Sequence, residues 1–98
     1  MAELREYELV MVVSPEVEDN AVTGTIERVT KFVQSHGGEV LQSDHWGRRR
    51  LAYKIKRYNE GNYVRAQLRM PPERTGELES NLRIAEDILR HLLVRKGT

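Results

Sequence analysis

The chain has 98 residues, of which 39% are hydrophobic and 32% are charged, and its formal net charge is only +1. These values favour one globular domain spanning residues 1–98. Cysteine is absent, which excludes disulfides, zinc thiolates and a thiol nucleophile and indicates a reducing compartment. No apolar run approaches the ~20 residues that cross a membrane, and Met1–Glu6 resembles neither a secretory signal nor a transit peptide. We therefore expect a cytoplasmic protein without a membrane partner.

The charge is distributed unevenly along the chain. Residues 1–45 carry three basic and nine acidic side chains, residues 46–69 carry eight and one, and residues 70–98 carry five of each. Positive charge is therefore concentrated in the middle third. Such a distribution is typical of a protein with one region that faces phosphate, while the rest faces water or protein.

The first predicted elements are a buried strand and an amphipathic helix. Tyr7–Val13 is almost entirely apolar and rich in β-branched residues, which predicts a strand buried on both faces and ended by Ser14-Pro15. Apolar residues then recur at helical spacing over Val22–Val33. The following Gly37-Gly38 predicts the end of this helix, because glycine readily adopts the left-handed conformation found there.

A long interrupted strand and its neighbour occupy the middle of the chain. Val40–Ile55 predicts one strand, with a bulge at Gly47 where the strand bends. Tyr58–Asn62 predicts a turn, and a further strand follows it to Met70. One face of that strand is expected to carry Val64, Ala66, Leu68 and Met70. The other is expected to carry Tyr63, Arg65, Gln67 and Arg69.

The last predicted elements are a short helix and a final strand. Pro71-Pro72 ends the preceding strand, and Pro72 is placed at the first position of a helix with Leu78, Leu82 and Ala85 on its apolar side. Ile88–Val94 predicts a strand with apolar residues on both faces. The order strand, helix, strand, strand, helix, strand is typical of an α+β protein with the ferredoxin-like split βαβ sandwich (βαββαβ). We therefore predict a four-stranded antiparallel sheet with two helices on one face.

Side chains suited to catalysis or metal binding are present but scattered. His36, His45 and His91 do not have the close spacing of a metal-binding motif, and no thiolate can complete a site. The serines lack a nucleophile-elbow context, and Gly37-Gly38 lacks the lysine of a phosphate loop. We expect no metal, no cofactor, no small-molecule substrate and no enzymatic activity, although ferredoxin-like folds do host enzymes.

The RNA-recognition motif has the same order of elements, but its third strand presents aromatic side chains for base stacking. Gly61–Arg65 offers only one aromatic residue, out of step with that pattern. Base stacking on the middle of the sheet is therefore not expected. The polar face with Tyr63, Arg65, Gln67 and Arg69 suits another protein or a backbone contact.

A basic stretch, Trp46–Ile55, reads Trp-Gly-Arg-Arg-Arg-Leu-Ala-Tyr-Lys-Ile. Arginine presents a rigid fork of donors that fits phosphate oxygens, and a neighbouring aromatic ring can stack on a base. The alternative is an ordinary basic strand with a solvated face. Because side chains alternate along a strand, Arg49 is not expected to share a face with Arg48 and Arg50 unless the bulge intervenes.

Two aromatic residues of this stretch have different expected roles. Trp46 either packs over the bulge as a structural cap or is an exposed contact for a partner or RNA. Tyr53 alternates with Leu51 and Ile55, and we expect it in the core.

The same stretch closely resembles the signature of the bacterial small-subunit ribosomal protein six family. The order and spacing of several other segments are also similar to that family. They are Tyr7-Glu8, Gly37-Gly38, Gly61–Val64, Leu82–Ile84 and Glu86–Arg90. The resemblance covers residues 7 to 95, nearly the whole chain, and the central motif is its specific part.

This resemblance implies a structural, non-enzymatic protein of the small ribosomal subunit with the ferredoxin-like fold. It also implies a heterodimer with ribosomal protein eighteen, bound to the central domain of the small-subunit ribosomal RNA. We assign RNA contacts to Arg48, Arg49, Arg50, Lys54, Lys56 and Arg57, and to a second cluster of Arg83 and Arg90 from the motif match. We assign partner contacts to Trp46, Tyr63, Arg65, Gln67 and Arg69.

Two features depart from the family pattern. Lys54 stands where the family often has proline, which offers an extra cation. Many members carry a C-terminal tail along the partner, whereas this chain ends at Thr98, so we expect a weaker pair. The alternative function is a ferredoxin-like ligand-sensing or dimerisation module. That alternative predicts a homodimer with a closed ligand pocket and leaves the positive middle third unexplained.

Overall fold

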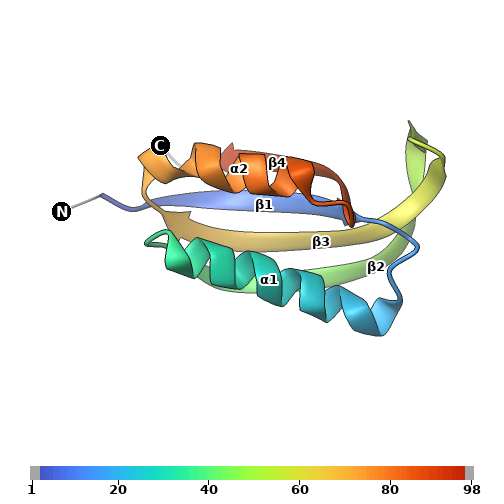
Figure 1. Ribbon diagram of the computed structural model, residues 1–98, viewed down its shortest axis with the longest axis horizontal. Coiled ribbons are helices and arrows are strands. Elements are labelled where there is room, and N and C mark those ends of the chain that lie inside the picture. The colour runs from blue at the N-terminus through green and yellow to red at the C-terminus, as the bar shows by residue number, and fades with distance from the viewer. Residues whose placement is uncertain (1–2, 97–98) are drawn as a thin grey trace.

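The computed structural model describes residues 3–96 except for the side chain of Asp19, so the end of the chain at Thr98 and the start of Met1–Glu6 lie outside the described residues. Four strands form one antiparallel sheet in the order β2-β3-β1-β4, and two helices cover one face of it (Figure 1). The elements are β1 (Arg5–Val13), α1 (Val22–Ser35), β2 (Glu39–Ile55), β3 (Tyr58–Met70), α2 (Thr75–Ile84) and β4 (Ile88–Arg95). Single turns of 3₁₀ helix at Asp19–Ala21 and Pro72–Arg74 precede α1 and α2. The predicted ferredoxin-like split βαβ sandwich is confirmed.

The core lies between the helices and the sheet, because the strand period of two and the helix period of about 3.6 residues turn the apolar side chains of both layers toward each other. Alternate residues of β1 and β3 point toward the helices, and every third or fourth residue of each helix points back. The fully buried side chains include Leu9, Met11, Val33, Val64, Leu68, Leu78 and Leu82. The opposite face of the sheet has no helix over it, and we call it the open face.

The prediction that β1 is buried on both faces is wrong over most of its length. Glu8 and Val10 point to the open face and are only half-buried. Val12, farther along the same face, is buried. The difference arises because only the end of β1 near Val12 is covered, by the curled hairpin that joins β2 to β3.

The turn between β2 and β3 lies earlier in the chain than predicted. Tyr58–Asn62 belongs to β3, and the chain reverses at Lys56-Arg57, directly after Ile55 pairs with Tyr58. Lys56 adopts a φ of 58°, in the left-handed region that a tight hairpin needs. Both ends of α2 also differ from the prediction. The helix begins at Thr75, after the 3₁₀ turn that contains Pro72, and it ends at Ile84, before Ala85.

The predicted bulge at Gly47 is present. The pairing of β2 with β3 shifts register between His45 and Gly47, and Gly47 has a φ of 91° that favours glycine. A further shift between Arg50 and Ile55 accompanies the hairpin tip as it rises from one end of the sheet (Figure 1). The tip curls over the open face, so Leu51 is only 8% exposed although no helix covers it.

Candidate nucleic-acid interface

The fold brings the predicted RNA-contacting residues to one end of the sheet. Arg48 pairs with Asn62, Asn62 with Val13, and Val13 with Ile88, so the base of the hairpin and the start of β4 lie in one row. Helix α2 ends four residues before β4 begins, at the same end (Figure 1). The residues gathered there are Arg48, Arg49, Arg50, Lys54, Lys56 and Arg57 of the hairpin, Arg83 of α2 and Arg90 of β4.

Two of these arginines hold the hairpin against the loop after β1. Arg48 donates to Glu60 Oε1 and to the backbone oxygen of Pro15, both at 2.9 Å. Arg57 donates to Glu16 Oε2 at 2.7 Å, and this hydrogen bond lowers the pKa of the exposed Glu16 carboxyl, with a smaller contribution from Tyr58. These two guanidinium groups therefore have a structural role at the hairpin, whatever else they contact.

Four other cations of the hairpin make no ion pair with any carboxylate that the structure describes, which are those of residues 3–96 other than Asp19. They are Arg49, Arg50, Lys54 and Lys56, and we call them the hairpin cluster. Arg83 likewise has no ion pair within that range. An unpaired, exposed cation can give its full hydrogen-bonding capacity to an incoming anion.

The bulge brings Trp46 and Arg49 together. The guanidinium carbon of Arg49 lies 5.9 Å from the centroid of the indole ring, within cation–π distance. Arg49 is paired with Gly61 while its neighbour Arg48 reaches Pro15, which supports the expected separation of these two arginines onto opposite faces. Trp46 is 45% exposed, which favours a contact residue over a structural cap.

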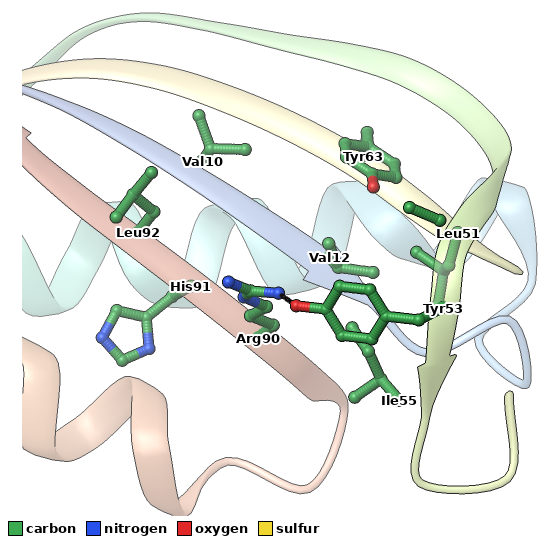
Figure 2. A pocket seen from close by; sticks show the side chains of 10 residues that line it. Val10, Val12, Leu51, Tyr53, Ile55, Tyr63, Arg90, His91 and Leu92 are labelled. Carbon is green, nitrogen blue, oxygen red and sulfur yellow. Dashed lines mark hydrogen bonds between the residues drawn. The ribbon is translucent and has the colours of Figure 1, made fainter. Parts of the chain in front are cut away.

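Tyr53 is not a core residue, contrary to the expectation from its spacing. Its ring is 60% exposed, its hydroxyl accepts a hydrogen bond from Arg90, and the guanidinium carbon of Arg90 lies 5.6 Å from the ring centroid (Figure 2). The alternation with Leu51 and Ile55 is real, but the hairpin tip extends past both helices. No layer of helix is available there to bury the ring.

The open face carries the predicted polar row on β3, and its arginines are matched by carboxylates from β1. Arg65 donates to Glu8 Oε2, and Arg69 Nη2 lies 3.9 Å from Glu6 Oε2. The partners Glu6 and Glu8 were missed as site residues. Their period-two spacing on β1 is the sequence signal that places them on this face, but the sequence does not show which strand lies beside β1.

An apolar depression lies where the hairpin tip curls over the open face. We call it the hollow, and it has a volume of about 240 Å³. Its principal lining residues are Val10, Val12, Leu51, Tyr53, Ile55 and Leu92, which come from β1, β2 and β4 (Figure 2). Sequence reasoning missed this feature, because it depends on how far the tip curls back over β1 and β4.

Two of the three histidines contact carboxylates of α2, and the third, His45, is exposed on β2. His36 Nε2 lies 2.9 Å from Glu77 and its ring stacks on Phe32, while His91 Nε2 lies 3.1 Å from Glu79. Within residues 3–96 no group of three or more potential metal ligands converges. No helix in the same range is long and apolar enough to cross a membrane.

Comparison with known proteins gives one consistent family. The family model described as ribosomal protein S6 matches residues 6–95. The small ribosomal subunit protein bS6 of Desulforamulus reducens is 40% identical over 94 residues, which cover 96% of this chain and 99% of that protein. Its counterpart in Heliobacterium modesticaldum is 41% identical and is covered to 97% of its length, with 95% of this chain.

A solved structure agrees with these sequence matches. The crystal structure of 30S ribosomal protein S6 from Thermotoga maritima superposes with a TM-score of 0.88 at 29% identity and covers 96% of this chain and 89% of that chain. The fold, the element order and the near full-length sequence matches therefore lead to the same conclusion: the chain belongs to the ribosomal protein S6 family.

Proposed function

We propose that this protein serves in the small ribosomal subunit by binding two partners through two different surfaces. The hairpin cluster, with Arg48, Arg57 and Arg83, contacts the central domain of the small-subunit ribosomal RNA. Arg90, which the sequence placed with Arg83 in RNA binding, pairs with Val12 and lies on the open face, so we assign it to the protein partner. The open face, with Trp46, Tyr63, Arg65, Gln67 and Arg69, binds ribosomal protein eighteen. Both assignments start from the family resemblance of the sequence and are supported by the charges and contacts of the two surfaces.

The observation that carries the proposal is the contrast in charge pairing between the two surfaces. Arg49, Arg50, Lys54 and Lys56 have no carboxylate partner in residues 3–96, and they are concentrated on one hairpin. Phosphate binding by such cations releases counterions from the nucleic acid, which favours association. The hairpin therefore has the electrostatic character of a surface that contacts an RNA backbone.

The open face has the opposite character. Its arginines Arg65 and Arg69 are already matched by Glu8 and Glu6, so the surface offers both signs of charge and little net attraction for phosphate. It also offers Trp46 as a half-exposed aromatic ring. Aromatic side chains and arginine are enriched at protein–protein interfaces, which supports a protein partner on this side.

The expected mechanism is assembly rather than catalysis. Members of the matched family are structural proteins of the ribosome and not enzymes, in agreement with the prediction from the sequence. A pair of proteins presents a larger basic surface to folded RNA than one chain does. The pair also reaches the RNA with its own interface already ordered, so binding of the protein partner and of RNA should be cooperative.

The test is RNA binding across a salt series by two matched triple variants. Replacing Arg50, Lys54 and Lys56 by alanine removes three charges from the hairpin, and the control variant removes three from Lys31, Arg95 and Lys96, which lie elsewhere. The hairpin variant should lower the slope of log affinity against log salt by roughly one unit for each phosphate that it no longer neutralises. The control variant should leave that slope close to the parent value.

Two results would contradict the proposal. Equal reductions of RNA affinity in both triple variants would mean that net charge, and not the hairpin, governs RNA binding. A tight homodimer without measurable affinity for ribosomal protein eighteen would favour the dimerisation module instead, although family membership argues against that alternative.

A further inference from the structure

The hollow beneath the hairpin tip is a well-formed apolar depression on the otherwise charged open face of residues 3–96. We propose that it is a socket for a single apolar side chain of the protein partner, seated beside a partner carboxylate that binds Arg90. This inference rests on the proposed function, because it gives the partner protein a specific anchoring point on the open face.

The size and lining of the hollow fit one side chain. Its volume of about 240 Å³ is below the roughly 300–1,000 Å³ of pockets that enclose whole small molecules. Val10 and Val12 of β1 form the floor with Leu92 of β4, and Leu51 and Ile55 of the hairpin form the wall (Figure 2). Anchoring side chains at protein interfaces commonly insert into small apolar pockets of this kind.

Exposed apolar residues mark the same place. Leu92 is 59% exposed in the free chain, on the edge strand β4. Covering such a side chain removes apolar surface from water, which favours association. An occupant of the hollow would contact Leu92 directly, whereas Val94, two residues farther along the same face and 46% exposed, does not line the hollow.

The guanidinium of Arg90 at the rim of the hollow indicates which charged group of the partner lies beside the inserted apolar side chain. Arg65 and Arg69 on the open face have carboxylate partners, but Arg90 has none among the carboxylates that the structure describes. Its guanidinium is held by the hydroxyl and ring of Tyr53 at the mouth of the hollow (Figure 2). A carboxylate next to the inserted side chain would replace a neutral hydroxyl by a charged acceptor, which forms the stronger hydrogen bond.

A nucleobase fits the hollow less well than an aliphatic or aromatic side chain of a protein. The floor and wall are aliphatic, and the polar side-chain atoms of the lining come only from Tyr53, Tyr63, Arg90 and His91, so most of the surface that an occupant would contact cannot read a base edge. The face of the Tyr53 ring on which a base would stack is near the Arg90 guanidinium already. The Arg65–Glu8 ion pair lies beside the hollow, because Arg65 pairs with Val10 in the sheet, and Arg90 is left as the cation at its mouth.

The experiment is calorimetric titration of the full chain with purified ribosomal protein eighteen, using a matched pair of variants. Leu92→Gln introduces a polar group into the hollow, and Val94→Gln makes a comparable change on the same strand and face outside it. Both residues are exposed, so the fold should be retained, which thermal unfolding checks. We expect Leu92→Gln to weaken partner binding at least about tenfold and Val94→Gln less than about twofold.

A second variant tests occupancy independently. Val10→Phe fills the hollow from within, and it should weaken partner binding by a similar factor while RNA binding in the absence of the partner stays at the parent level.

Arg90→Gln should weaken partner binding at least about fivefold, because the incoming carboxylate loses its charged donor.

The possible results distinguish failure of the socket proposal from failure of the proposed function. Equal, small effects of Leu92→Gln and Val94→Gln would overturn the socket, while continued binding of the partner by the parent chain would leave the proposed function intact. No heat of binding between the parent and ribosomal protein eighteen would overturn both. Loss of RNA affinity in Leu92→Gln without the partner would assign the hollow to a nucleobase and overturn the socket.

Discussion

The guanidinium of Arg28 on α1 donates hydrogen bonds to both carboxylate oxygens of Asp87 in the turn before β4, with nitrogen–oxygen distances of 2.8 and 3.1 Å. Thr25 donates a further hydrogen bond to Asp87 Oδ2 at 2.8 Å, and the backbone oxygen of Asp87 accepts one from Ser14. This single residue therefore ties α1 and the end of β1 to the turn that starts β4. Burial acts to raise the pKa of Asp87, but the hydrogen bonds from Arg28 and Thr25 together outweigh it and hold that pKa below its ordinary value.

The lowered pKa of Asp87 predicts how stability depends on pH. A carboxyl with a depressed pKa in the folded state contributes stability that is fully present above its unfolded pKa, near 3.8. That contribution is lost as pH falls from there through the lower folded pKa. We expect Asp87→Asn to cost about 1.5–3 kcal/mol at pH 7 and much less at pH 2. Urea unfolding across that range measures it, and Glu86→Gln at the exposed neighbouring position should change little. A loss for Asp87→Asn that stays constant down to pH 2 would contradict the assignment.

Gly61 is predicted to be required for the hairpin to lie close to β1. A Cβ atom at this position would lie 2.5 Å from Val12 Cγ1 and 3.2 Å from the backbone oxygen of Val13. Gly61→Ala should therefore destabilise the protein by about 1–3 kcal/mol through overpacking, measured by chemical denaturation. Gly24→Ala on α1, where an added Cβ meets nothing within 4 Å, should be neutral or stabilising by up to ~1 kcal/mol. The added substitution Val12→Ala should recover part of the loss; a purely additive double variant would show that the clash is not the cause.

Substitutions of Arg48 and Arg50 should change different properties: that of Arg48 the stability of the fold, and that of Arg50 the affinity for RNA. Arg48 holds Glu60 and the backbone of Pro15, whereas Arg50 has no ion pair within residues 3–96. Arg48→Ala should lower stability by about 0.5–1.5 kcal/mol, because these contacts are exposed. Arg50→Ala should leave stability unchanged and reduce RNA affinity. Thermal unfolding and RNA titration of the two variants provide the comparison, and a stability loss in Arg50→Ala equal to that in Arg48→Ala would show that the division is wrong.

Trp46 is the only tryptophan in the chain, so its fluorescence reports on one place. The ring is half-exposed beside Arg49, next to the open face. Binding of ribosomal protein eighteen should cover the ring and shift its emission to shorter wavelength, because the indole leaves water. Addition of an RNA fragment without the partner should change the emission much less. A blue shift with RNA alone and none with the partner would move Trp46 from the protein interface to the RNA interface.

Much of the architecture is predictable from local patterns. The alternation in β3 assigns Val64, Ala66 and Leu68 to the core face and Arg65 to the other, because side chains of a strand alternate regardless of what surrounds it. The bulge at Gly47 is predictable too, since an interruption of the strand pattern by glycine is a local signal. The concentration of positive charge in the middle third is a property of composition and needs no structure.

Other features depend on contacts between distant parts of the chain. Arg65 finds its carboxylate on Glu8, 57 residues away, and Arg57 finds Glu16 across 41 residues, so their availability for a partner could not be judged from sequence. Tyr53 has the spacing of a core residue but lies beyond the reach of both helices. Periodicity states which side of a strand a residue occupies, but only the tertiary structure decides whether that side is covered. At the hollow that side is covered because the hairpin tip curls back and places Leu51 and Ile55 beside Val12 and Leu92.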